Sequence, residues 1–257
     1  ARAGMASSGG VQGQCTATAP FVATPTLEAE VDAAGPVDFS CYTTPAALGP
    51  SRMVPVSGCI DIFGVGSVVT NGIKIAVYGI DQNPGPGGDT PQYGERDVIK
   101  NAASPCDSEG EYSFPALPTN KPLIFKTRDT SASPQAVDTY QYNVVIRSDF
   151  HDPDGNGQFV IDANIIFNST YTAIPNTAGK SIEGGNVLTD KTGKGAVAGG
   201  VRDCGGSGRT VKNATVGGSC FDTRAKLVYF DGGEDPRPAL TRTGTNTDGL
   251  YAVVNVQ

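Results

Sequence analysis

The acidic residues in the segment 151–162 have the spacing of a calcium-binding loop. Asp152, Asp154 and Asn156 occupy the first, third and fifth positions of an EF-hand-type loop, and Gly157 occupies the sixth. Alternate carboxylates and amides in a tight turn bring several oxygens to one hard cation. The candidate ligands are the side chains of Asp152, Asp154, Asn156 and Asp162 and the carbonyl of Gln158.

The end of this segment departs from the calcium-loop pattern. Ala163 stands where a bidentate Glu is expected, and Asp162 comes one residue early. No helical pattern precedes the loop, so a plain Asx and glycine turn between two modules is the alternative interpretation. Calcium is the only cofactor that the sequence suggests, and it remains a hypothesis.

Catalytic chemistry finds little support in the sequence. The sequence contains no nucleophile-elbow motif for which the single histidine, His151, could act as general base. His151 lies among aspartates in a polar loop. Intradiol ring-cleaving dioxygenases share Gly-x-Val and Asp-Gly-x-Tyr patterns, but they need two histidines and two tyrosines to hold iron, which one histidine cannot supply. We therefore expect a protein that is not an enzyme and has no catalytic residues.

The cysteines indicate an oxidising compartment. None belongs to a Cys-x-x-Cys pair, so a zinc site is not expected. An even number at wide spacing is typical of disulfides in exported proteins, although buried thiols are the alternative. Pairing by proximity in the sequence predicts the bonds Cys15–Cys41, Cys59–Cys106 and Cys204–Cys220.

Charge and hydropathy restrict the partners. The formal net charge is −7 and the basic residues are scattered, which argues against nucleic-acid binding. No apolar run is long enough for a transmembrane helix. The N-terminus lacks the pattern of a signal peptide, so we expect a secreted or cell-surface protein whose signal is already removed.

Two stretches far apart in the chain are copies of one pattern. Residues 106–117 and residues 245–256 each contain an acidic residue, a glycine, a spacer, a tyrosine and alternating apolar residues. Each follows a strand-like run that carries a glycine, at residues 56–63 and 197–204. Such a repeat predicts tandem β modules, in which Glu109-Gly110 and Asp248-Gly249 form the turns.

These residues resemble the carboxypeptidase regulatory-like domain. The Gly-bearing first strand, the turns Asn71-Gly72 and Asn213-Ala214, and the Asp/Glu-Gly-x-Tyr motif carry the resemblance, which covers residues 52–130 and 195–257. It implies a transthyretin-like, Ig-like β-sandwich of secreted bacterial proteins, without catalytic residues. The chain departs from the family at Asn120, where a glycine is usual, and at Gln257, which precedes the expected final strand.

The predicted fold is all-β, with tandem Ig-like or transthyretin-like antiparallel β-sandwiches. In residues 52–150, about seven short strands separated by Gly/Pro turns are typical of a sandwich. One shared face of a strand is predicted for four residues spaced two apart, Tyr140, Tyr142, Val144 and Ile146. For Tyr140 and Tyr142 the interpretations are core packing, edge packing or a binding stripe. The predicted parts are a flexible arm (1–14), an N-terminal strand pair (15–51), the first sandwich (52–150), a connector (151–194), and a second sandwich lacking its last strand (195–257). The strand pair is expected at residues 27–31 and 37–42. The connector contains the calcium loop and a short helix at residues 163–175, ended by Pro175.

Two functions are compatible with this organisation. The first is a non-catalytic structural or adhesive subunit of a cell-surface or filamentous assembly, which binds copies of itself or neighbouring surface proteins. The alternative is a ligand- or carbohydrate-binding accessory module of a larger secreted protein. Exposed strand edges favour the first function, because edges accept strands from neighbours. An exposed aromatic platform on one sheet favours the second.

Overall fold

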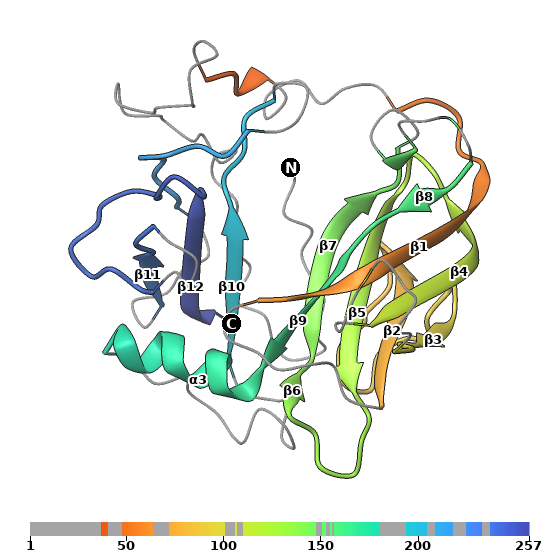
Figure 1. The fold of residues 1–257 in the computed structure, drawn as a ribbon, viewed down its shortest axis with the longest axis horizontal. Helices are drawn as coiled ribbons and strands as arrows, with labels where there is room; N and C mark the ends of the chain where they lie inside the picture. The colour runs from red at the N-terminus through yellow and green to blue at the C-terminus, as the bar shows by residue number, and fades with distance from the viewer. Residues whose placement is uncertain are drawn as a thin grey trace. The chain divides into compact units, whose positions relative to one another are not determined.

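The structure is a computed structural model and is dominated by β-strands (Figure 1). It describes residues 37–40, 48–63, 72–100, 106, 110–147, 151–152, 155, 157–179, 194–204, 209–217, 225–232 and 237–256. The all-β prediction is confirmed for these residues. They divide into two compact units, one formed by the described residues between 48 and 171, the other by those between 37 and 40 and from 172 onwards.

The unit of residues 48–171 contains two sheets. One has the order β4-β1-β9-β6, with β8 paired to β1, and the other has the order β3-β2-β5-β7. The first sheet consists of β4 (Glu111–Pro118), β1 (Met53–Ile62), β9 (Ala163–Phe167), β6 (Ala136–Val137) and β8 (Phe159–Val160). The second consists of β3 (Glu95–Asp97), β2 (Ile73–Gly79), β5 (Pro122–Asp129) and β7 (Thr139–Val145).

One hydrophobic core joins these two sheets. The alternation expected from the sequence is observed, because every second side chain of β1 and of β2 points inward. The first sheet contributes residues such as Val56, Ile60, Phe114, Phe159 and Ile165 to the core, and the second contributes Ile73, Ile75, Leu123 and Phe125. The arrangement fits a β-sandwich, in which each sheet buries one face against the other.

The strand pairing is not purely antiparallel, which corrects the expectation from the sequence. β1 pairs antiparallel with β4, but it pairs in parallel with β8 and β9. Both of these strands lie in the segment that the sequence assigned to a connector. The alternation of Ala163, Ile165 and Phe167, all buried, explains why this segment adds to the sheet.

The helix α3 (Asn168–Thr177) follows β9 directly. The sequence predicted a short helix within residues 163–175, ended by Pro175. The first five of these residues instead form β9, and the helix continues through Pro175 to Thr177. Because Pro175 lies in the last turn, it removes only one hydrogen bond near a helix end that already leaves carbonyls unpaired.

The other unit contains a three-stranded sheet in the order β10-β12-β11. Its strands are β10 (Gly195–Gly200), β12 (Leu250–Val256) and β11 (Lys226–Tyr229), and both pairings are antiparallel. The N-terminal strand pair was predicted to include residues 37–42, but Val37, Asp38 and Phe39 lie outside any strand. The flexible arm (1–14) and the other predicted N-terminal strand (27–31) lie outside the described residues.

Both copies of the repeated pattern form the same pair of strands. Gly58 lies opposite Tyr112 in the β1–β4 pair, and Gly199 lies opposite Tyr251 in the β10–β12 pair. The turn glycines behave as expected, with φ of 99° at Gly110 and 72° at Gly249. Their carbonyls accept equivalent hydrogen bonds, from the Ile60 N–H at 3.1 Å and from the Val201 N–H at 2.9 Å.

Candidate functional site

The described part of the predicted calcium loop forms a tight turn around Asp152. This side chain is buried, and both of its carboxylate oxygens accept the N–H of Gly157 at 3.2 Å. Gly157 has a φ of 79°, as the sharp turn of such a loop requires. Asp154 and Asn156 lie outside the described residues, and Gln158 is exposed.

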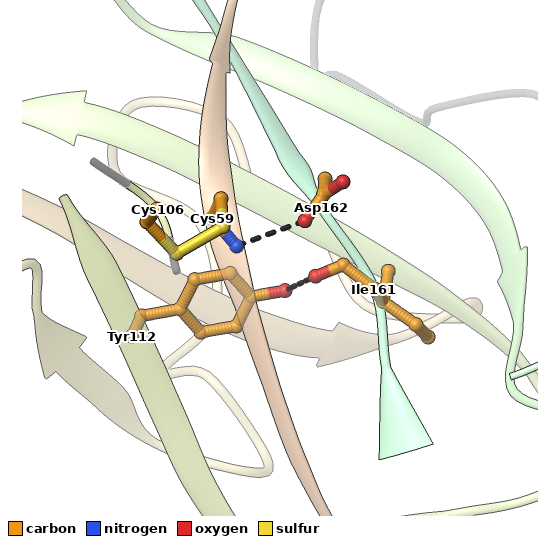
Figure 2. The surroundings of a disulfide bond; sticks show 5 residues. All are labelled: Cys59, Cys106, Tyr112, Ile161 and Asp162. Atoms are coloured by element: carbon orange, nitrogen blue, oxygen red, sulfur yellow. Dashed lines mark hydrogen bonds between the residues drawn. A yellow bond between two sulfur atoms is a disulfide. The ribbon is translucent and has the colours of Figure 1, made fainter. Parts of the chain in front are cut away.

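Asp162, the last predicted ligand, contacts β1 (Figure 2). Its carboxylate accepts the backbone N–H of Cys59 at 2.9 Å. Burial and the nearby charge of Asp162 raise the pKa of Asp61, so two carboxylates lie close together on this side of the sheet. The described residues contain no group of three or more His, Cys, Asp or Glu side chains arranged to hold a metal ion.

The disulfide Cys59–Cys106 is present, as predicted from the spacing of the cysteines. It joins β1 to the loop that precedes β4, next to the pair formed by Gly58 and Tyr112 (Figure 2). Cys204 is also disulfide-bonded, but its predicted partner Cys220 lies outside the described residues. Cys15 and Cys41 lie outside them as well.

His151 has a local structural role. Its ring nitrogen Nδ1 lies 3.0 Å from the backbone N of Arg147. The backbone N–H of His151 donates to the Arg147 carbonyl at 2.8 Å. The imidazole is half-buried in this turn. His151 thus closes a turn of the backbone through its contacts with Arg147.

The tyrosines of β7 do not share a face with the valine and isoleucine that follow them. Val144 pairs with Leu123 and Tyr142 pairs with Ile124, so Asn143 is an extra residue in β7, with a φ of 60°. This bulge reverses the alternation. Val144 and Ile146 therefore pack with the core, whereas Tyr140 and Tyr142 lie on the opposite side of the sheet. The prediction of one shared face was wrong, because the pattern alone does not reveal a bulge.

The outer side of the four-stranded sheet combines these tyrosines with charged residues. We name it the tyrosine face and define it by the residues that share it, Lys74, Ala76, Tyr78, Ile124, Lys126, Arg128, Tyr140 and Tyr142. The rings of Tyr140 and Tyr142 are stacked, with centroids 6.2 Å apart and an interplanar angle of 24°. Tyr142 is 43% exposed, whereas Tyr78 is buried.

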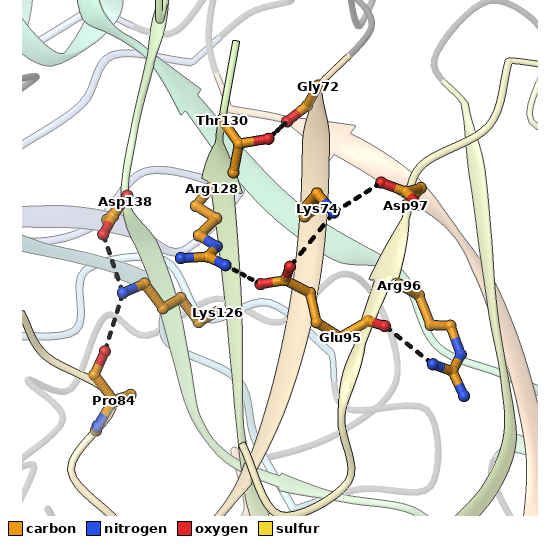
Figure 3. A network of polar contacts seen from close by, with 10 residues as sticks. All are labelled: Gly72, Lys74, Pro84, Glu95, Arg96, Asp97, Lys126, Arg128, Thr130 and Asp138. Carbon is orange, nitrogen blue, oxygen red and sulfur yellow. Dashed lines mark hydrogen bonds and ion pairs between the residues drawn. The ribbon is translucent and has the colours of Figure 1, made fainter. Parts of the chain in front are cut away.

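Ion pairs cross this face from strand to strand (Figure 3). Glu95 of β3 contacts both Lys74 and Arg128, and Lys74 also lies 3.1 Å from Asp97. Hydrogen bonding to Asp97 and its charge raise the pKa of Lys74. Three cationic side chains (Lys74, Lys126 and Arg128) thus balance three anionic ones (Glu95, Asp97 and Asp138).

Lys126 is the buried centre of the tyrosine face. Its ammonium group lies 3.0 Å from Asp138 and donates to the Pro84 carbonyl at 3.0 Å. It also lies 5.2 Å from the centre of the Tyr140 ring, a distance at which a cation is attracted to the ring. Burial and the charge of Asp138 raise the pKa of Tyr140. A buried charge with this many partners holds its neighbours in place.

Sequence reasoning missed the tyrosine face. The signal was present in part, because Lys126 and Arg128 are two residues apart in β5, which places them on one face of the strand. The partner carboxylate Glu95 lies on β3 and Asp138 lies between β6 and β7, and only the tertiary structure brings them near.

The outer edge of β10 is a second candidate functional site. This strand pairs with β12 on one side, and no described residue pairs with its other side. Its residues include no charge and no proline, and Val197 is 46% exposed. Such an edge presents backbone N–H and C=O groups to the surroundings.

Comparisons with known proteins do not identify a relative. The chain matches no protein-family model. Searches of curated proteins and of solved structures also found no match. Among the described helices, none is long and apolar enough to cross a membrane.

Proposed function

We propose that the protein is a non-catalytic structural or adhesive subunit of a cell-surface or extracellular assembly, and that it joins its neighbours through the outer edge of β10. The observation that carries this proposal is the exposed, uncharged edge of the sequence GAVAGG. Edge strands of soluble proteins are normally protected by lysines, prolines, bulges or covering loops. An edge without such protection suits the addition of a strand from a neighbouring molecule.

At two other edges of the described strands, the backbone groups already have hydrogen-bond partners. On the outer edge of β9, the Asn164 N–H donates to the Gln141 side chain at 2.9 Å, and the Ile166 N–H donates to Thr139 Oγ1 at 3.2 Å. On the outer edge of β11, the Ala239 N–H donates to the Tyr229 carbonyl at 2.8 Å. Side chains and a short return of the chain thus take the place of a partner strand at these two edges.

The disulfide supports the proposed location outside the cytoplasm. Cys59 and Cys106 enclose a long loop, and such bonds form and persist in oxidising compartments. The repeated Gly–Tyr strand pair supports the proposal that the two copies of the pattern are related modules, of the carboxypeptidase regulatory-like type that the sequence resembles. Modules of that type are scaffolds, which agrees with a structural function.

The test is the association state of a variant with a charged β10 edge. We expect the wild-type protein to associate with increasing concentration in sedimentation velocity experiments. Val197→Lys, alone or with Ala198→Lys, introduces repulsion at the edge and is expected to give monomers. Leu240→Lys, at a residue of the same unit that is 59% exposed, is the matched control and keeps the association.

Two results contradict the proposal. One is a wild-type protein that stays monomeric over the whole concentration range and binds no neighbouring surface protein. The other is a Val197→Lys variant that associates as the wild type does, while its circular dichroism shows an intact fold.

A further inference from the structure

We propose that Lys126 and Asp138 condense to form an amide bond between their side chains, which ties β5 covalently to the segment that enters β7. This inference goes beyond the proposed function and does not depend on the β10 edge, which belongs to the other unit. It assigns a chemical step to two charges that lie covered beside the tyrosine face.

The strand register brings the two side chains together. Lys126 pairs with Tyr140 across β5 and β7, and Asp138 precedes Tyr140 by two residues, so it lies diagonally across from Lys126. A long side chain reaches such a diagonal neighbour on the next strand. The Lys126 amine and a carboxylate oxygen of Asp138 are 3.0 Å apart (Figure 3). The nitrogen is therefore in contact with the carboxyl group whose carbon it would attack.

Both groups are shielded from water. The side chain of Lys126 is 7% exposed and that of Asp138 is 10% exposed, whereas Lys74 and Asp97 of a neighbouring ion pair are 31% and 71% exposed. Away from water, an amine and a carboxyl group both lose the hydration that stabilises their charged forms. Transfer of one proton between them then gives a neutral amine, which is a nucleophile, and a protonated carboxyl group, which can release water. Burial thus favours the forms that react.

Tyr140 places a proton donor beside the carboxyl group. Burial and the charge of Asp138 raise the pKa of Tyr140, and a hydrogen bond between the two side chains adds to this rise. The phenol therefore keeps its proton at neutral pH and well above it. A hydroxyl fixed next to a carboxyl group stabilises the negative oxygen of a tetrahedral intermediate, as the donors of an oxyanion hole do.

The step balances without any further reactant. The ammonium of Lys126 gives one proton to the carboxylate of Asp138, and its Nζ atom then attacks the Cγ atom to form the C–N bond. The C–O bond to the protonated oxygen breaks, a second proton passes from the nitrogen to the departing hydroxyl, and one water molecule leaves. An ammonium and a carboxylate become an amide and water, with no oxidant, reductant or cofactor.

The same surroundings suit the product. The amide keeps one N–H, and it can donate to the Pro84 carbonyl, to which Lys126 donates at 3.0 Å. The amide oxygen can accept the hydroxyl of Tyr140, so each polar group of the new bond has a partner. The two buried charges, which are costly to keep away from water, disappear. Two groups held in contact also react as though each were present at about 10⁵ M or more, which favours the amide over its hydrolysis.

A bond at this place secures the end of a sheet. β7 is the last strand in the order β3-β2-β5-β7, and within this sheet it pairs with β5. The amide would keep the start of β7 attached to β5 even when the hydrogen bonds between the two strands open. Such a tie suits a subunit of an extracellular assembly.

Mass spectrometry of the intact wild-type protein, after reduction and denaturation, tests the proposal. We expect a mass one water molecule below that of the sequence, and a peptide map that joins Lys126 to Asp138. Lys126→Arg keeps the positive charge but lacks the amine, so it should have the full mass of its own sequence. The exposed pair of Lys74 and Asp97 is the internal control, and the map should show both residues unmodified.

Tyr140→Phe tests the proton donor. We expect this variant to form the bond about a hundredfold more slowly than the wild type, followed by mass over a time course of cell-free synthesis. Circular dichroism checks that each variant is folded. A folded Tyr140→Phe variant that forms the bond as fast as the wild type overturns the role given to Tyr140.

A wild-type protein with the full mass of its sequence overturns the proposal, and this result does not depend on the folding of any variant. A lower mass that persists in Lys126→Arg also overturns it, because the water would then be lost elsewhere, as in a succinimide at Asp248-Gly249. Hydroxylamine makes the same distinction, since it opens succinimides and leaves side-chain amides intact.

Discussion

Gly58 of β1 lies directly opposite Tyr112 of β4. Because Gly58 has no side chain, the backbone of Ile161 can pass close to it. A Cβ atom at Gly58 would lie 1.7 Å from the Ile161 carbonyl oxygen. That same oxygen accepts the hydroxyl of Tyr112 at 2.5 Å (Figure 2). The pair thus anchors the segment that leads into β9, the strand that makes the sheet partly parallel.

The second copy of the pattern forms the same pair with a different neighbourhood. Gly199 lies opposite Tyr251, and a Cβ atom at Gly199 would lie 3.0 Å from the Tyr251 hydroxyl oxygen. The closest atoms here belong to the end of a side chain and not to the backbone. The common element of the two copies is therefore the tyrosine ring that covers a glycine, a known way to stabilise glycine in a sheet.

Gly58→Ala is expected to destabilise the unit of residues 48–171 by about 3 kcal/mol or more, because the backbone carbonyl of Ile161 cannot move without breaking the β1–β8 pairing. Urea unfolding followed by circular dichroism measures this change. A variant that unfolds at the wild-type urea concentration would show that the close approach does not matter.

Gly199→Ala is the matched comparison in the other unit. The ring of Tyr251 can give way by a small rotation, so we expect a cost of about 1 kcal/mol. Equal losses of stability in the two variants would contradict the distinction between a backbone contact and a side-chain contact.

Alkaline pH is expected to destabilise the same unit through its buried tyrosines. Burial and the charge of Asp162 raise the pKa of Tyr112, and burial and the charge of Asp138 raise the pKa of Tyr140. In the unfolded chain these phenols ionise near pH 10, roughly their ordinary pKa. Above that pH the unfolded chain loses protons that the folded unit keeps, so the stability, complete below about pH 10, falls as the pH rises.

The urea midpoint between about pH 9 and pH 11 measures this effect, at up to about 1.4 kcal/mol per pH unit for each tyrosine. Tyr112→Phe removes one of these contributions and gives a shallower fall. Near neutral pH the same variant loses the hydrogen bond to Ile161 and is expected to be about 1 kcal/mol less stable. A pH profile identical to that of the wild type would be inconsistent with a protonated, buried Tyr112.

Reduction of the disulfide is expected to cost about 4 kcal/mol, because Cys59 and Cys106 are separated by 47 residues and their bond restricts the unfolded chain. The double variant Cys59→Ser, Cys106→Ser reports this loss without a reducing agent, and its urea midpoint should fall accordingly. Peptide mapping of the oxidised protein would also test the predicted bonds Cys15–Cys41 and Cys204–Cys220. A mapped bond from Cys204 to any other cysteine refutes the pairing by proximity.

The calcium hypothesis predicts a higher thermal midpoint at about millimolar calcium. Asp152→Asn keeps an acceptor for the Gly157 N–H but removes the charge, so it should abolish the rise in midpoint. Asp81→Asn removes an exposed carboxylate outside the loop and serves as the control that keeps the rise. Absence of any rise in the wild-type protein would leave the simple Asx and glycine turn as the explanation.

Local features of the fold could be predicted because they depend on residues close in the sequence. Gly110 and Gly249 have positive φ, in turns that the Asp/Glu-Gly pairs of the sequence predict. The alternation in β1 shows which of its side chains are buried, whereas β2 also buries Ala76 and Tyr78 on its other face. The bond Cys59–Cys106 followed from proximity between two cysteines inside one predicted module.

Features that join distant segments escaped sequence reasoning. β8 and β9 looked like parts of a connector, and nothing in their residues indicates a parallel partner. The extra residue Asn143 cannot be recognised in a run that alternates on either side of it. The carboxylates that hold Lys74, Lys126 and Arg128 come from other strands or turns.

The amino-acid sequence by itself determined the all-β class, the turns and the cross-linked cysteines Cys59 and Cys106, since each depends on residue type and short spacing. The tertiary structure decided which strands are neighbours, which side of β7 carries Tyr142 and which edge of β10 stays open. The physical reason is that strand register belongs to a pair of strands: a single bulge moves a side chain from one face of a sheet to the other.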